Sequence, residues 1–116
     1  MTRLVIETER HGDVAVVRLT GELDLSTQHL LADALAEPLS AERPRIVVDT
    51  ARLSFCDSSG LWQLINCQRQ AEARGGGLRL IGVHGIMARL LVITQLVDQF
   101  PPYGTLERAC QWSTLP

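Results

Sequence analysis

Lysine is absent from this chain of 116 residues, so each of its 11 Lys and Arg positions is an arginine. The formal net charge is −2. Non-specific binding to nucleic acid depends on clustered basic side chains, and this balance argues against it. Arginine pairs with carboxylates through two parallel hydrogen bonds. We therefore expect no direct nucleic-acid partner, while acidic protein partners stay open.

Long apolar runs are also missing. The longest lies around residues 90–93 and falls far short of the roughly 18 residues that span a bilayer. Residues 1–7 carry no apolar segment typical of a secretory signal peptide. These two absences predict a cytoplasmic protein with no membrane partner.

Cysteine is scarce and widely spaced. Cys56, Cys67 and Cys110 form no Cys-x-x-Cys pair, which excludes the usual zinc and thioredoxin motifs. An odd number of cysteines without a disulfide framework suits a reducing compartment. We expect no metal and no cofactor.

Apolar residues make up 46% of the chain, enough for a core in a single domain over residues 1–116. Hydrophobic periodicity predicts the order β-β-α-β-α-β-α-β-α, an α/β class with crossover helices. The predicted strands are 4–9, 14–20, 45–49 and 78–82, with a last extended piece at 100–103. Four helices are predicted. The first begins at a cap on Asp24 or Ser26 and ends before Pro38. The second covers 61–71, the third covers 86–97, and the fourth runs from 104 or 105 through 112.

Two acid-bearing turns follow strands of this layout. Residues 21–24 come after the second strand and residues 55–60 after the third. The carboxyl ends of parallel strands meet at one edge of a sheet. We therefore expect the two turns to share one face of the molecule.

Catalysis by the serines of the second turn is disfavoured. A nucleophile elbow requires glycine two residues before the serine, but Cys56 and Asp57 precede Ser58 and Ser59. A serine nucleophile also needs a base, and His84 is the only histidine that this layout brings toward the turn. The pattern predicts no catalytic residue.

Phosphate-loop and metal chemistry are disfavoured as well. The glycines at 75–77 precede a strand, and no lysine follows them, whereas a phosphate loop needs the reverse order and a lysine. Asp24, Asp49 and Asp57 lack metal-ligand spacing, and each has a simpler use as a helix cap or a strand-end acid.

The tetrapeptide Asp57-Ser58-Ser59-Gly60 has two interpretations. It can cap the helix that follows and do nothing more. However, one capping residue is enough, and Gly60 in the first turn costs about 1 kcal/mol of helix propensity relative to alanine. A small residue there would let a partner's backbone approach closely, which favours a regulated docking site.

The two turns resemble the signatures of the STAS-domain anti-sigma-factor antagonists of bacteria. Gly-Glu-Leu-Asp at 21–24 resembles the first signature, and residues 53–61 resemble the second, around the phosphorylated serine. Residues 76–80 and the helix ending in Thr94 also follow the family's course. The resemblance implies a single STAS domain, with a small mixed, mainly parallel sheet packed with about four helices.

The resemblance also implies a function, and it is not that of an enzyme. The unphosphorylated protein would bind an anti-sigma factor that is a serine kinase of the GHKL ATPase type and so free a sigma factor. The kinase would then phosphorylate Ser58, and a PP2C-type phosphatase would restore the protein. The partner-contacting residues implied by the two signatures, with their neighbours, are Glu22, Asp24, Ser26, Thr27, Asp57, Ser59, Gly60, Leu61 and Trp62.

The chain departs from the family at three places. Trp62 stands where a small residue is common, either as a half-buried surface side chain or as a partner contact. Gln95 replaces a glycine, and Val92 replaces an acid, which leaves 86–97 unusually apolar and consistent with a second contact surface or a homodimer. A scaffold or transporter-associated STAS module without phosphorylation is the alternative function.

Overall fold

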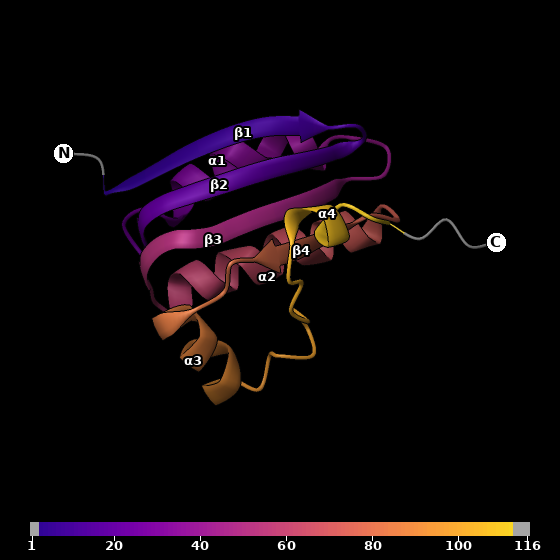
Figure 1. Cartoon of the computed structure of the whole chain (residues 1–116). Helices are drawn as coiled ribbons and strands as arrows, with labels where there is room; N and C mark the ends of the chain where they lie inside the picture. Colours follow the sequence, from indigo (N-terminus) through magenta and orange to yellow (C-terminus); the bar gives the residue numbers. More distant parts are fainter. Residues whose placement is uncertain (1–2, 113–116) are drawn as a thin grey trace.

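A single four-stranded sheet organises the chain, and the computed structural model describes residues 3–112 of it. The spatial order is β1-β2-β3-β4, with β1 antiparallel to β2 and the other pairs parallel (Figure 1). The strands are β1 (Leu4–His11), β2 (Val14–Leu23), β3 (Arg45–Cys56) and β4 (Gly77–Ile81), and the helices are α1 (Gln28–Leu39), α2 (Ser58–Ala73), α3 (Gly85–Ile93) and α4 (Leu106–Ala109). The predicted α/β class and mixed, mainly parallel sheet are confirmed.

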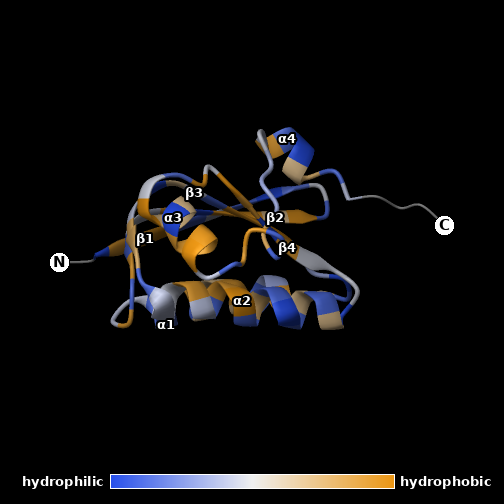
Figure 2. Ribbon diagram, turned by 90° about the horizontal axis from the view of Figure 1, so that it is seen from below, coloured by the Kyte–Doolittle hydropathy of each residue, from blue (hydrophilic) through white to orange (hydrophobic). Residues whose placement is uncertain are grey.

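Helices cover both faces of this sheet. α1 and α2 lie on one side and the short α4 on the other (Figure 2). Along β2, Val17 and Leu19 belong to the larger apolar cluster on the α1 and α2 side, while Val14 and Val16 belong to the smaller cluster on the α4 side. Burial on both faces explains why this strand begins as an unbroken apolar run.

The fifth predicted strand does not form. Tyr103 makes one isolated parallel bridge to Ile81, and residues 100–103 are otherwise irregular. Pro101 and Pro102 carry no backbone N–H, so this segment cannot continue a ladder of hydrogen bonds along β4.

Several element boundaries also differ from the prediction. β3 continues to Cys56 because residues beyond 49 keep pairing with β2 after register shifts. The residue before α1 is Thr27, which makes no side-chain capping bond, whereas a cap from Asp24 or Ser26 was predicted. The helix also continues past its predicted end, through Pro38 to Leu39. α3 ends at Ile93 because the backbone turns left-handed at Gln95, with φ of 60°.

The C-terminal segment is held to the second face by Arg79. Its guanidinium lies 3.8 Å from the ring centroid of Trp112 and 4.9 Å from that of Tyr103. The same group donates to the carbonyl oxygens of Ala109 and Gln111 at 3.0 and 2.9 Å. Trp112 therefore lies outside α4 and packs against the sheet, whereas the sequence placed it inside the last helix.

The helices are short. Within residues 3–112, none has the length and apolar character that a bilayer-crossing helix requires.

Candidate functional site

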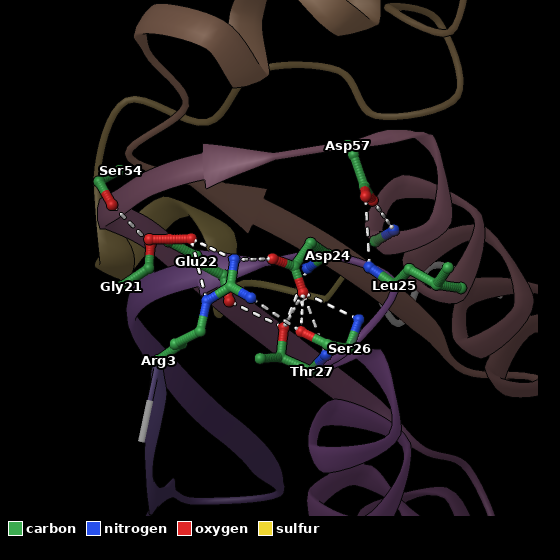
Figure 3. Close-up of polar contacts among 10 residues, drawn as sticks. Arg3, Gly21, Glu22, Asp24, Leu25, Ser26, Thr27, Ser54 and Asp57 are labelled. Carbon is green, nitrogen blue, oxygen red and sulfur yellow. Dashed lines mark hydrogen bonds and ion pairs between the residues drawn. The ribbon is translucent and has the colours of Figure 1, made fainter. Parts of the chain in front are cut away.

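The two acid-bearing turns meet at the end of β2 and β3, as the predicted layout required. Leu23 and Cys56 are paired at the last position of the β2–β3 ladder. The backbone N–H of Asp57 then donates to the carbonyl oxygen of Leu23 at 3.2 Å. Slightly earlier, Ser54 Oγ donates to the carbonyl oxygen of Gly21 at 3.0 Å (Figure 3). Long-range hydrogen bonds therefore join the two turns into one surface.

Asp57 connects these turns through both oxygens of its carboxylate. One oxygen accepts from the backbone N–H of Gly60 at 2.9 Å, which caps the start of α2. The other accepts from the backbone N–H of Leu25 at 3.2 Å (Figure 3). The side chain that the sequence identified as a helix cap thus also positions the neighbouring loop.

Gly60 is required by packing inside the chain. A Cβ at this position would lie 2.6 Å from the carbonyl oxygen of Leu23, and Gly60 itself is buried. The sequence suggested that its small size leaves room for a partner's backbone. The structure corrects that reason, because the close approach is made by β2 of the same molecule.

Residues 22–27, the last two residues of β2 and the turn after it, are ordered by their own side chains, and we call this segment the 22–27 loop. Asp24 Oδ1 accepts from the backbone N–H groups of Ser26 and Thr27 at 2.9 and 3.1 Å and from Ser26 Oγ at 2.8 Å. Thr27 Oγ1 donates to the carbonyl oxygen of Glu22 at 2.8 Å and accepts from the N–H of Asp24 at 2.9 Å. This network holds the loop in one conformation ahead of α1.

Arg3 adds a cation to the loop. Its guanidinium pairs with Glu22 at 2.5 Å, forms a second ion pair with Asp24, and donates to Ser26 Oγ at 3.1 Å (Figure 3). Hydrogen bonds from Ser26 hold the pKa of Asp24 below its ordinary value, and Arg3 lowers this pKa further. No local pattern in the sequence pointed to Arg3. Only the hairpin register, in which Leu4 pairs with Gly21, brings it to this loop.

Ser58 and Ser59 begin α2 beside this loop. Ser58 is its first residue and is exposed, while Ser59 is half-buried. Both line a groove of about 420 Å³ that also contacts Trp62. The backbone N–H groups of a helix start, together with the helix dipole, favour a negative charge at this position.

Comparison with known proteins identifies the family. A family model described as "Mlab, STAS domain" matches residues 6–101. The chain belongs to the STAS domain family. Among curated proteins, the anti-sigma F factor antagonist of Paenibacillus polymyxa is 33% identical to this STAS domain over 101 residues, which cover 86% of each chain.

Solved structures agree with this assignment. An anti-sigma factor antagonist from Mycobacterium paratuberculosis superposes with a TM-score of 0.80 at 27% identity, covering 91% of this chain and 90% of that one. The antagonist SpoIIAA, solved in its unphosphorylated form, gives 0.76 at 25% identity, with coverages of 90% and 92%. These three proteins are all named as antagonists, which act by binding another protein.

The STAS domain buries part of the partner-contacting set expected from its sequence. Ser26, Ser58 and Trp62 are exposed, and Glu22, Asp57 and Ser59 are half-buried. Asp24, Thr27 and Gly60 are buried, and the side chain of Leu61 packs in the core with 2% exposure. These four buried residues therefore contribute to the surface chiefly by holding its backbone and neighbouring side chains in place.

Apolar side chains surround the same end of the STAS domain. Leu25 is 72% exposed at the tip of the 22–27 loop, Trp62 is 54% exposed on α2, and Phe55 is exposed at the end of β3. Leu25 and Phe55 were not among the contact residues predicted from the sequence. An apolar residue inside an otherwise polar turn was the available signal, and it is also typical of a protein contact surface.

His84, the only histidine expected near the serines, has a structural contact instead. Its ring Nε2 lies 2.8 Å from the carbonyl oxygen of Ala51, and the residue precedes α3. Across residues 3–112, no group of three or more metal-ligating side chains gathers at one place. The arrangement at the Ser58 end is suited to binding a protein and to accepting a charge.

Proposed function

We propose that this STAS domain is an anti-sigma factor antagonist switched by phosphorylation of Ser58. In the unphosphorylated form it binds an anti-sigma factor that is also a serine kinase of the GHKL ATPase type, and this frees a sigma factor. Phosphate transfer to Ser58 dissociates the complex, and a PP2C-type phosphatase later removes the phosphate from Ser58. The observation that carries the proposal is the exposed Ser58 hydroxyl at the start of α2, between the 22–27 loop and Trp62.

The fold can accept the phosphate without rearranging. A phosphoserine adds about −1.5 to −2 charges and three acceptor oxygens. At the first residue of α2 these oxygens would lie beside the helix start, where the N–H groups that Asp57 does not cap and the helix dipole favour a negative charge. The name of a structural neighbour, SpoIIAA of Bacillus in its phosphorylated form, supports the idea that this family accommodates the group.

The docked complex cannot accept the same charge. Asp57 is the adjacent residue, and Glu22 and Asp24 lie in the loop that Asp57 contacts. Arg3 is a single cation shared by these last two carboxylates. A dianion buried against such a surface by a partner costs several kcal/mol, and each 1.4 kcal/mol changes affinity about tenfold. A loss of about 100-fold or more is therefore expected.

Calorimetric titration against the ATPase-type anti-sigma factors of the source genome tests the proposal. Wild type and Ser58→Ala should bind one of them, and Ser58→Asp should bind it at least about 100-fold more weakly. Ser40→Asp adds the same charge at the far end of α1 and should bind as wild type does. With ATP, the wild type alone should gain one phosphate, which Ser58→Ala should not. Binding without any phosphate transfer would favour the alternative of a non-phosphorylated STAS scaffold or transporter-associated module.

A further inference from the structure

A groove runs along α2 away from Ser58. Its α2 wall contains Ser58, Trp62, Ile65 and Arg69, which follow one another at spacings of four, three and four residues. Residues with these spacings form one stripe of a helix, about 16 Å long for eleven residues of rise. The opposite wall comes from the segment after α3 and contributes Thr94, Leu96 and Gln99.

α3 borders this groove and is apolar nearly all round. Arg89 is the only charged or polar side chain among its nine residues. Met87 and Leu91 are buried, whereas Val92 is 65% and Ile93 is 76% exposed. A helix without a polar face is normally covered on all sides. Val97, four residues after Ile93, and Trp62, in the α2 wall of the groove, are exposed as well, so large apolar side chains lie exposed on α3, on the segment after it and in the groove wall.

Two cations of this region, Arg69 and Arg89, make no ion pair within residues 3–112. Arg69 lies 5.4 Å from the ring centroid of Trp62. Neither Arg69 nor Arg89 has a carboxylate within 4.0 Å among the residues that the structure describes, although Arg3 and Arg18 do. Arginine readily pairs with carboxylates at interfaces. This surface is therefore complementary to an apolar segment that carries acidic residues at its ends.

We propose that the groove and the exposed side of α3 form a second docking surface for the anti-sigma factor, where an apolar segment of that partner flanked by carboxylates binds. The inference rests on the proposed function. It adds that the contact extends past Ser58 along α2 to Arg69 and onto the exposed Ile93 of α3.

The charges of the chain favour this occupant over two others. A two-fold contact between copies centred on α3 would place Arg89 opposite Arg89, and like charges across an interface are unfavourable. A membrane surface of anionic lipid attracts clustered Lys and Arg, but this chain has no lysine and a net charge of −2. A separate protein with acidic residues meets neither objection.

The groove also extends the phosphorylation switch. Ser58 lies in its wall, so a segment bound along Trp62 and Ile65 passes beside the serine hydroxyl. A phosphate there would repel the carboxylates of that segment as well as add to the acids of the 22–27 loop. The bound segment and the phosphate are therefore mutually exclusive.

Titration of the anti-sigma factor that binds wild type tests this surface. Ile93→Glu and Val92→Glu should each weaken binding at least about 30-fold, and Arg69→Glu about tenfold. Val5→Glu changes a 50% exposed valine on β1, and Arg108→Glu reverses a charge on α4, so both should stay within about twofold of wild type. Circular dichroism of each variant should match that of wild type, which checks that the variant is folded.

Three results would overturn the inference. If Ser58→Asp abolishes binding while Ile93→Glu and Val92→Glu bind like wild type, the second surface is wrong and the proposed function stands. If wild type binds no anti-sigma factor, the proposed function itself fails. If light scattering shows a dimer of this chain that Ile93→Glu dissociates, a second copy occupies the surface instead.

Discussion

The backbone N–H of Leu25 donates to the carboxylate of Asp57 at 3.2 Å, across 32 positions of sequence. The other oxygen of that carboxylate caps α2 at the N–H of Gly60. One acidic side chain thus fixes both the loop that follows β2 and the helix that begins with Ser58. Any change at Asp57, or any new charge beside it, acts on both parts of the candidate docking surface.

Removal of the Asp57 carboxylate should loosen both parts. Asp57→Ala is expected to lower the free energy of unfolding by about 1 kcal/mol, because a helix cap is lost, and to speed hydrogen exchange at the Leu25 amide. Asp57→Asn keeps a capping oxygen and should lose less stability. Urea unfolding and amide exchange measure the two effects. Asp98→Ala, at an exposed position, is the control, and an unchanged Leu25 amide in Asp57→Ala would contradict the link.

Alanine at position 60 should destabilise the protein even though alanine is the better helix former. The new Cβ would lie 2.6 Å from the Leu23 carbonyl oxygen. Overpacking of this kind costs about 1–3 kcal/mol, more than the gain of about 1 kcal/mol in helix propensity. Gly104→Ala meets open space and serves as the matched control. A Gly60→Ala protein more stable than wild type in urea would refute this account.

The 22–27 loop should lose its order in acid. Hydrogen bonds from Ser26 and the charge of Arg3 lower the pKa of Asp24 in the folded protein. Because the pKa is lower in the folded protein, the carboxylate stabilises the fold above the unfolded pKa of about 3.9, and this contribution is lost as the pH falls from there through the folded pKa. The stability difference between wild type and Asp24→Asn should stay constant from about pH 7 to pH 5 and shrink below about pH 4. A difference that persists unchanged into stronger acid would contradict the assignment.

The thiols should differ sharply in reactivity. Burial raises the pKa of Cys56 to about 12 and that of Cys67 to about 11, so neither forms thiolate near neutral pH. Cys110 is half-buried and its pKa is also raised by burial, but it is the most accessible of the three. Ellman's reagent should modify Cys110 alone in the native protein and all three cysteines in guanidinium. Rapid reaction of Cys56 in the native state would show that the turn before Ser58 opens.

Much of this architecture could be predicted because it depends on local pattern. The apolar run of β2 and the helical spacing after Gly60 indicated an α/β fold. The rule for parallel strands placed the two acid-bearing turns at one edge. Asp57 was recognisable as a capping residue because helix caps are satisfied within a few positions of the chain. The same local information was insufficient for the piece at 100–103, where proline prevents a fifth strand.

Local sequence pattern was enough to predict the order of the elements through α3, the meeting of the two turns and the place of Ser58 at a helix start. Three features come from contacts in the folded chain alone: Arg3 pairs with Asp24, Leu23 packs against Gly60, and α3 keeps an apolar side exposed. The reason is physical. Periodicity and capping act over one or two helical turns, whereas strand register and the packing of helices depend on contacts between residues far apart in the chain.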